Sequence, residues 1–225
     1  ILTKSLPSIL FAAVISSIFF WIYGSYNMVG LAGIFLAFWI ISNILLTTIQ
    51  QLIVKNKEVA QNNIPKYSIE MITAHLGVAL LILGITGSSI WQKEKIIRMK
   101  VNDKTSIHNY NIVFKEISEV TGPNYVALQG NFWVYNNKKN IITKLKPENR
   151  FYPVTNNSTT EASIHTNLSR DLYVVIGDGD LNRGWIVRIY YNPLVVWIWI
   201  GAFAIFLGGL FSMKNNLKKL KRLSI

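Results

Sequence analysis

The sequence contains no cysteine, and charged residues make up only 15% of its 225 positions. Without cysteine, the chain can form neither a disulfide-stabilised secreted module nor a cysteine-based zinc site. The low charge content argues against a soluble nucleic-acid-binding protein, although the net charge is +12. Because 51% of the residues are hydrophobic, intrinsic disorder is excluded as well. The remaining class is a basic membrane protein, for which we expect no nucleic-acid partner.

Charge is absent from the first part of the chain over an unusual length. No charged residue lies between Lys4 and Lys55, and a stretch of that length accommodates two membrane crossings of about 20 residues each. We therefore predict a transmembrane hairpin of two helices over residues 1–54. Glycine and asparagine near its middle place the helices at about Leu6–Tyr23 and Gly30–Ile49.

Two further uncharged runs predict a third transmembrane helix over residues 69–92 and a fourth over residues 189–213. Buried helices of a globular domain are the alternative, but such helices seldom stay uncharged for about 18 residues. Lysine and arginine concentrate in residues 55–68 and in the tail, 214–225, which the positive-inside rule assigns to the cytoplasm. Binding of the basic tail to anionic membrane lipid is an alternative interpretation. Residues 93–188 then lie on the opposite face of the membrane.

The segment 93–188 differs in pattern from the helices around it. Short runs of β-branched and aromatic residues alternate with asparagine-, glycine- and proline-containing turns, a pattern typical of antiparallel strands. We predict one small antiparallel β domain of about six to eight strands, inserted into an integral α-helical membrane protein of about four transmembrane helices. Gly177–Asp180 is interpreted as a turn, because the distant glutamate of a calcium loop is absent.

No catalytic motif occurs: the sequence has no nucleophile elbow, no Walker loop and no His-Glu-x-x-His. Of the three histidines, His108 and His165 lie among polar residues of the predicted β domain and are interpreted as exposed. His75 lies inside the third predicted helix, where an ionisable group is a functional candidate by default. A neutral imidazole is a good ligand for haem iron. A hydrogen bond to a neighbouring helix is the alternative role for His75.

Small residues surround His75 on the predicted helix. Gly77 and Gly84 fall on the opposite face and would let a neighbouring helix approach closely. Ala79, one turn after the histidine, would leave room for a bulky group such as a flat macrocycle. If the iron is held by two histidines, the second must come from outside this chain, because its other membrane segments contain none.

Several strings resemble the C-terminal part of the CcmF family, the haem lyase subunits of the system I machinery for cytochrome c maturation. The resemblance runs in order from about Ile69 to Gly209. The strings are Ala74-His75-Leu76-Gly77, Thr121-Gly122-Pro123-Asn124-Tyr125, Tyr152-Pro153-Val154, Thr159-Thr160-Glu161-Ala162, Asp171-Leu172-Tyr173-Val174, Tyr190-Tyr191-Asn192-Pro193-Leu194-Val195 and Trp197-Ile198-Trp199-Ile200-Gly201.

The resemblance implies that the chain is a C-terminal portion of a haem lyase that helps attach haem covalently to apocytochrome c. It implies that His75 is an axial ligand to the iron of a membrane haem b, with the second ligand outside this chain. Tryptophan-rich haem-handling segments of the family have no counterpart here, so the isolated piece is not expected to catalyse ligation. An opening Ile1 without a signal-peptide pattern agrees with a piece of a longer protein.

The implied partners are the haem chaperone CcmE, a CcmH-type thiol-handling subunit, apocytochrome c, the N-terminal part of the lyase and membrane lipid. The implied location is the bacterial inner membrane, or the mitochondrial inner membrane, with the β domain on the periplasmic or intermembrane side. An alternative from another class is a membrane-anchored scaffold with a partner-binding β domain and no haem of its own.

Overall fold

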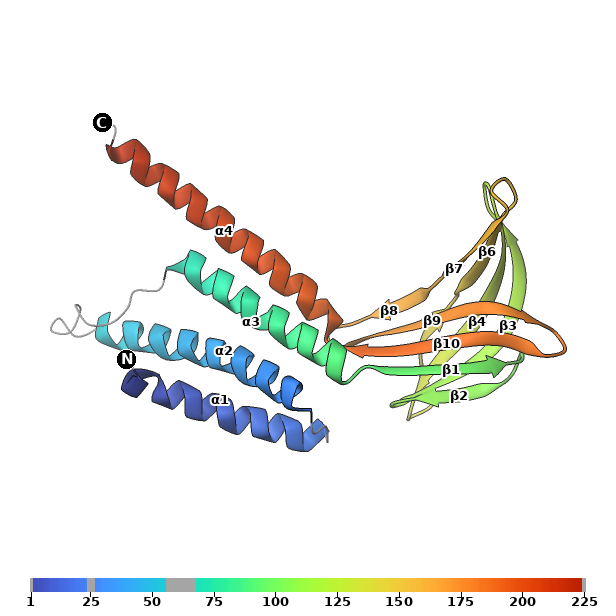
Figure 1. The fold of residues 1–225 in the computed structure, drawn as a ribbon, viewed down its shortest axis with the longest axis horizontal. Helices are drawn as coiled ribbons and strands as arrows, with labels where there is room; N and C mark the ends of the chain where they lie inside the picture. Colours follow the sequence, from blue (N-terminus) through green and yellow to red (C-terminus); the bar gives the residue numbers. More distant parts are fainter. Residues whose placement is uncertain (1, 24–26, 56–67, 224–225) are drawn as a thin grey trace. The chain divides into compact units, whose positions relative to one another are not determined.

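The computed structural model describes residues 2–23, 27–55 and 68–223, and it divides the chain into two compact units (Figure 1). The first unit contains the helices and comprises Ile1–Ile90 and Leu194–Ile225. The second unit, Trp91–Pro193, contains only strands and the turns between them. The predicted fold class, an α-helical membrane protein with an inserted antiparallel β domain, is confirmed.

The helical unit contains α1 (Leu2–Tyr23), α2 (Met28–Lys55), α3 (Ile69–Ile90) and α4 (Val195–Leu223). Helix α1 packs on α2, α2 on α3, and α3 on α4 (Figure 1). The side chain of Asn27 caps the start of α2 by accepting hydrogen bonds from the first free backbone N–H groups of that helix. Helix α3 therefore lies between two partners and has two faces to fill.

Three of these helices contain segments long and apolar enough to cross a membrane, namely Met28–Gln51, Ile69–Ile90 and Val195–Asn215. In α1 the apolar stretch among the described residues is Leu6–Phe19, which is shorter. The described part of the chain thus supplies three candidate crossings, and the predicted crossing at Leu6–Tyr23 stays a prediction.

The β unit contains ten strands in two antiparallel sheets. The first sheet has the order β1-β10-β9-β8, and the second has the order β2-β3-β4-β6-β7 with β5 paired to β4. The strands are β1 (Lys93–Met99), β2 (Lys104–Ile107), β3 (Tyr110–Thr121), β4 (Val126–Asn136), β5 (Ile141–Leu145), β6 (Glu148–Tyr152), β7 (Asn157–Glu161), β8 (Ser163–Thr166), β9 (Arg170–Asp180) and β10 (Gly184–Pro193).

Side chains from both sheets share one apolar core. Every second residue of β9 is buried, from Leu172 through Val174 to Ile176, as expected for strands that show one face to a core. Phe114 stacks on Phe132 within the second sheet at 4.5 Å between ring centres, and it meets Trp185 of the first sheet edge-on at 5.8 Å. These aromatic contacts join the two sheets across the core.

The end of the last strand and the position of the last turn in the β unit differ from the prediction. Residues 189–193, which we expected to open the fourth helix, form the last part of β10. Tyr190 and Tyr191 pair there with β1 on one side and β9 on the other, so their backbone hydrogen bonds are used in the sheet and α4 begins only at Val195. Strand β9 likewise extends through Asp180, so the predicted turn at Gly177–Asp180 lies instead at residues 181–183.

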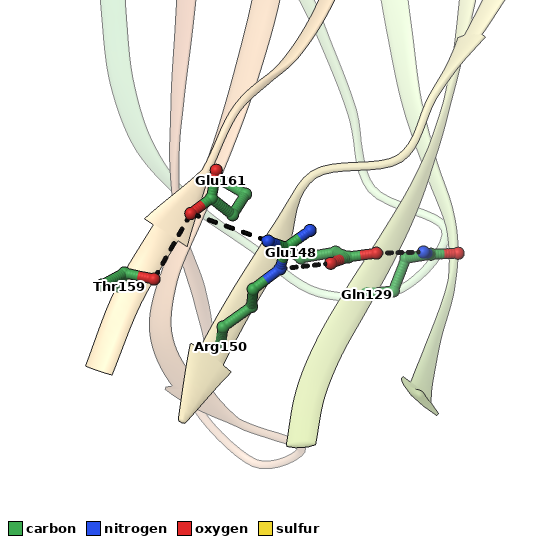
Figure 2. Close-up of polar contacts among 5 residues, drawn as sticks. All are labelled: Gln129, Glu148, Arg150, Thr159 and Glu161. Carbon is green, nitrogen blue, oxygen red and sulfur yellow. Dashed lines mark hydrogen bonds and ion pairs between the residues drawn. The ribbon is translucent and has the colours of Figure 1, made fainter. Parts of the chain in front are cut away.

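Polar contacts hold β6 and β7, two of the strands that the apolar pattern does not predict. Figure 2 shows Arg150 of β6 donating to Glu148 through Nε at 2.8 Å and lying 3.9 Å from Glu161 of β7. Gln129 of β4 donates to the other Glu148 oxygen at 2.7 Å. These contacts connect β4, β6 and β7. The hydrogen bond from Arg150 lowers the pKa of Glu148, so the carboxylate stays charged in neutral solution.

Candidate functional site

His75 lies in the second turn of α3, near the end at which this helix begins. The Ser68 backbone carbonyl accepts from the N–H of Ile72 at 2.9 Å and so closes the first turn of the helix. From Ile69 onward the sequence is apolar except for a few positions, and this composition keeps the helix continuous past the histidine. The His75 side chain is exposed within the described part of the chain.

One hydrogen bond sets the orientation of the His75 ring. Its Nδ1 lies 2.9 Å from the backbone carbonyl of Met71, one turn earlier. A carbonyl oxygen can only accept, so Nδ1 must carry the proton and donate. In the neutral form of the imidazole, this arrangement leaves the lone pair of Nε2 free. A metal-binding histidine usually has this arrangement, with one nitrogen donating to a carbonyl and the other available to a metal.

A cavity of about 270 Å³ opens beside the imidazole, between α2 and α3. Its walls are mostly apolar, which suits a hydrophobic group held at membrane depth. The lining residues are Trp39, Ile40, Asn43, Ile44, Met71, Ile72 and His75. The cavity thus joins one imidazole nitrogen to an apolar space formed by two helices.

The structure confirms the close helix packing predicted for the glycine face of α3, but the predicted space on the His75 face lies elsewhere. Gly77 and Gly84 meet α4 so closely that an added Cβ would lie 2.7 Å from the carbonyl of Gly201 or the N–H of Ile198. The predicted room beside Ala79 does not exist, because Ala79 is fully buried. The space lies one turn before His75 instead, where Met71 and Ile72 line it together with residues of α2.

The other two histidines belong to the β unit and lie apart in its sheets. His108 occupies a turn with a positive φ of 49°, and its ring centre lies 4.5 Å from that of Tyr191, with the two ring planes tilted by 33°. Partial desolvation of its ring, followed by the positive charge of Lys93, lowers the pKa of His108. It is exposed as expected, and no described contact joins it to His165.

His165 is half-buried and contacts a residue that the sequence gave no reason to select. Arg170 is 1% exposed, and its Nη1 lies 2.8 Å from His165 Nδ1 and 3.0 Å from the His165 carbonyl. The guanidinium also lies over the ring of Tyr110 at 4.4 Å. Arg170 lies two residues before Leu172 in β9, where every second residue is buried. This spacing was the one signal in the sequence that Arg170 is buried.

A second hollow, of about 490 Å³, lies on the outer face of the first sheet. Tyr173 and Tyr190 stack at its edge at 4.5 Å, and a hydrogen bond to Glu94 raises the pKa of Tyr190. The lining residues are Thr160, Tyr173, Val175, Gly177, Asp178, Ile186, Arg188 and Tyr190. This set contains no histidine, so it offers no imidazole ligand for iron.

The acidic residues near the last β turn do not form a metal site. Asp178 accepts a hydrogen bond from Asn149 at 3.0 Å. Asp180 accepts from the backbone N–H groups of Asn182 and Arg183 and pairs with the Arg183 side chain. Within residues 2–23, 27–55 and 68–223, no group of three or more histidine, cysteine or acidic side chains could hold an ion.

Comparison with known proteins adds independent information. Residues 90–193 match a family model described as the CcmF C-terminal beta-sandwich. The Cytochrome c-type biogenesis protein CcmF of Escherichia coli is 41% identical over 140 residues, which cover 62% of this chain and 22% of that protein. Its counterpart in Pseudomonas fluorescens is 30% identical over 203 residues, covering 88% of this chain and 30% of that protein.

A solved structure named Cytochrome c Heme Lyase CcmF has the same fold. It superposes with a TM-score of 0.69 over 92% of this chain and 34% of that chain, at 18% sequence identity. That likeness extends across both the helical and the β unit. The matched regions cover between 22% and 34% of these relatives.

Proposed function

This chain belongs to the CcmF family, whose C-terminal region it represents, and on that premise we propose that it works in cytochrome c biogenesis as the C-terminal portion of a haem lyase. Within that role, His75 provides one axial ligand to the iron of a membrane haem b. The second ligand comes from outside this chain, since His75 is the only histidine outside the β unit. A bound haem would supply a one-electron iron centre at membrane depth.

The observation that carries this proposal is the hydrogen bond from His75 Nδ1 to the Met71 carbonyl. It fixes the tautomer and leaves Nε2 as the ligand atom. The ring is therefore oriented before anything binds, and the mostly apolar residues of α2 and α3 that line the cavity give the ligand position a surrounding of low polarity. Neither His108 nor His165 lines this cavity, and Nδ1 of His165 faces the guanidinium of Arg170 instead.

The remaining roles follow from the family relationship. The full lyase attaches haem to apocytochrome c, receiving it from a CcmE-type chaperone and working with a CcmH-type subunit. This chain contributes one part of that complex and does not act as a lyase alone. The β unit lies on the periplasmic or intermembrane side of the inner membrane, framing the place where haem and apocytochrome meet.

The test is an absorption spectrum of membranes containing the assembled lyase. His75→Ala removes the ligand atom, so the b-type haem band should disappear while immunoblotting shows the chain still inserted. His108→Ala is the matched control, because it removes an exposed histidine of the β unit and should leave the band unchanged. A band that survives His75→Ala would refute the ligand assignment and favour a scaffold without its own haem.

A further inference from the structure

One carboxamide lies in the apolar wall of the His75 cavity. Asn43 of α2 lines this cavity, and its Nδ2 donates to the Trp39 carbonyl one turn earlier at 2.8 Å. Its Oδ1 accepts from the hydroxyl of Ser8 on α1 at 3.1 Å. A polar side chain within a membrane helix is costly unless it has hydrogen-bond partners or a function.

These two contacts fix the orientation of the Asn43 amide but do not use all of its hydrogen-bonding groups. A carboxamide has two N–H donors and an oxygen with two lone pairs, and the described contacts use one of each. The Trp39 carbonyl can only accept, so the amide cannot be flipped. One N–H of Asn43 is therefore left, in a side chain whose orientation is already set.

Asn43 also lies at the same depth in the membrane as His75. The antiparallel helices α2 and α3 meet where Gly33 faces Thr86. Ten residues after Gly33 along α2 is Asn43, and ten residues before Thr86 along α3 is Leu76, which adjoins His75. Because both helices rise equally per residue, the amide and the imidazole reach the cavity at one level.

We propose that Asn43 donates its remaining N–H to an oxygen acceptor of the group that His75 binds, and so positions that group in the cavity. This inference rests on the proposed function, in which the bound group is a haem. The acceptor is a propionate carboxylate of the haem, since the iron takes its two axial ligands from His75 and from outside this chain. Asn43 is thus a positioning residue, and His75 is the iron ligand.

A purely structural role for Asn43 makes a different prediction. In that case the amide would matter only through its contact with Ser8, which joins α1 to α2 together with a bond from the Ser42 hydroxyl to the Ser8 carbonyl. Ser8→Ala removes the same interhelical hydrogen bond but leaves the cavity wall intact. It is therefore the matched control for Asn43→Leu, which keeps the side-chain volume and removes the amide.

The experiment measures haem retention and the reduction potential of the b-type haem in the assembled lyase in detergent. Asn43→Leu should weaken retention about tenfold, as for the loss of one hydrogen bond to a charged acceptor, and should lower the potential, because the N–H no longer stabilises negative charge. Ser8→Ala should change neither. Equal effects of the two variants, or no effect of Asn43→Leu, would overturn the proposal.

Two further arms test the acceptor and the underlying function. With haem whose propionates are methyl esters, the effect of Asn43→Leu should shrink, and an undiminished effect would overturn the proposal. His75→Ala is measured in parallel. If it leaves the haem band intact, the proposed function fails; if it abolishes the band while Asn43→Leu behaves as wild type, only the positioning role fails.

Discussion

At the scale of single residues, the β unit contains a charge that is buried without an acidic partner. Arg170 is 1% exposed, and no carboxylate pairs with it among the described residues. A guanidinium has only donors, so His165 Nδ1, 2.8 Å away, must accept and cannot be protonated while the contact lasts. The side chain of His165 thus acts as the neutral acceptor that a buried arginine requires.

This contact should make the β8–β9 hairpin sensitive to pH. Burial, and then the charge of Arg170, lowers the pKa of His165 in the folded protein. Because the pKa of His165 is lower in the folded state, the unfolded state binds the proton more readily. The stability that this contact contributes is therefore present above the ordinary histidine pKa of about 6.5 and is lost as the pH falls below it. Hydrogen exchange of the β8 and β9 amides, measured on the whole chain in detergent and corrected for intrinsic exchange, should show protection that falls as the pH is lowered from about 7 to about 5.

His165→Asn provides the matched variant, because its amide oxygen can accept from Arg170 but does not titrate. Its exchange rates should show a flatter dependence on pH after correction for intrinsic exchange. His108→Asn controls for the other lowered histidine of the β unit and should leave the dependence at β8–β9 in place. An unchanged pH dependence in His165→Asn would refute the coupling.

At the scale of elements, glycines determine how α3 and α4 pack. An added Cβ at Gly77 would lie 2.7 Å from the Gly201 carbonyl, and one at Gly201 would lie 2.6 Å from the backbone N–H of Leu81. Because backbone atoms rather than flexible side chains occupy these positions, the two helices cannot simply repack around a methyl group. The close pairing in turn fixes the turn of α3 that carries His75.

Two adjacent glycines of α4 test this packing. An added Cβ at Gly208 would lie 2.8 Å from both Cβ and N of Ala74, whereas one at Gly209 would meet nothing within 4 Å. We expect Gly208→Ala to destabilise the helical unit by about 1–3 kcal/mol and Gly209→Ala to be neutral or slightly stabilising. Unfolding of the whole chain in mixed micelles measures both, and similar losses in the two variants would contradict close packing at Gly208.

The strands show which elements a sequence pattern can reveal. Apolar runs predicted the segments now seen in β1, β3, β4, β5, β9 and β10, because their buried faces must be hydrophobic. Strands β2, β6, β7 and β8 were missed, since short polar sequences such as Asn-Ser-Thr-Thr-Glu in β7 contain no such run. Cross-strand polar contacts around Glu148 and Arg150 hold β6 and β7 (Figure 2).

At the scale of the whole molecule, the distribution of charge predicts the orientation in the membrane. The four helices and their short connections contain nine basic and two acidic residues, and residues 93–188 contain fourteen basic and nine acidic ones. Most of the lysines that set the orientation lie in residues 55–66 and 214–222. Of these, Lys57 and Lys66 lie outside the described residues.

A topology reporter tests this orientation. Asn140 is exposed and follows the turn between β4 and β5, so an inserted reporter should not disturb the core. A reporter active only outside the cytoplasm should be active at Asn140 and silent when fused after Ile225, because the basic tail stays in the cytoplasm. Activity at the tail fusion with silence at Asn140 would reverse the orientation of the whole chain.

The sequence alone determined the features that depend on local composition and order. Uncharged runs revealed the long apolar helices, alternation revealed most core strands, and short strings in order identified the family, which the comparisons confirm. It also placed His75 inside a helix apolar enough to cross a membrane, because the position of a residue along an apolar helix is a local property. His75 as a haem ligand remains a prediction.

Tertiary structure decided which distant segments share a space. The cavity beside His75 exists because residues 39–44 of α2 come to lie against residues 71–75 of α3, and no local pattern specifies that pairing. The burial of Arg170 against His165 and the strand pairing of β6 with β7 likewise depend on register between elements. Composition limits which surfaces must be buried, but packing decides what each surface meets.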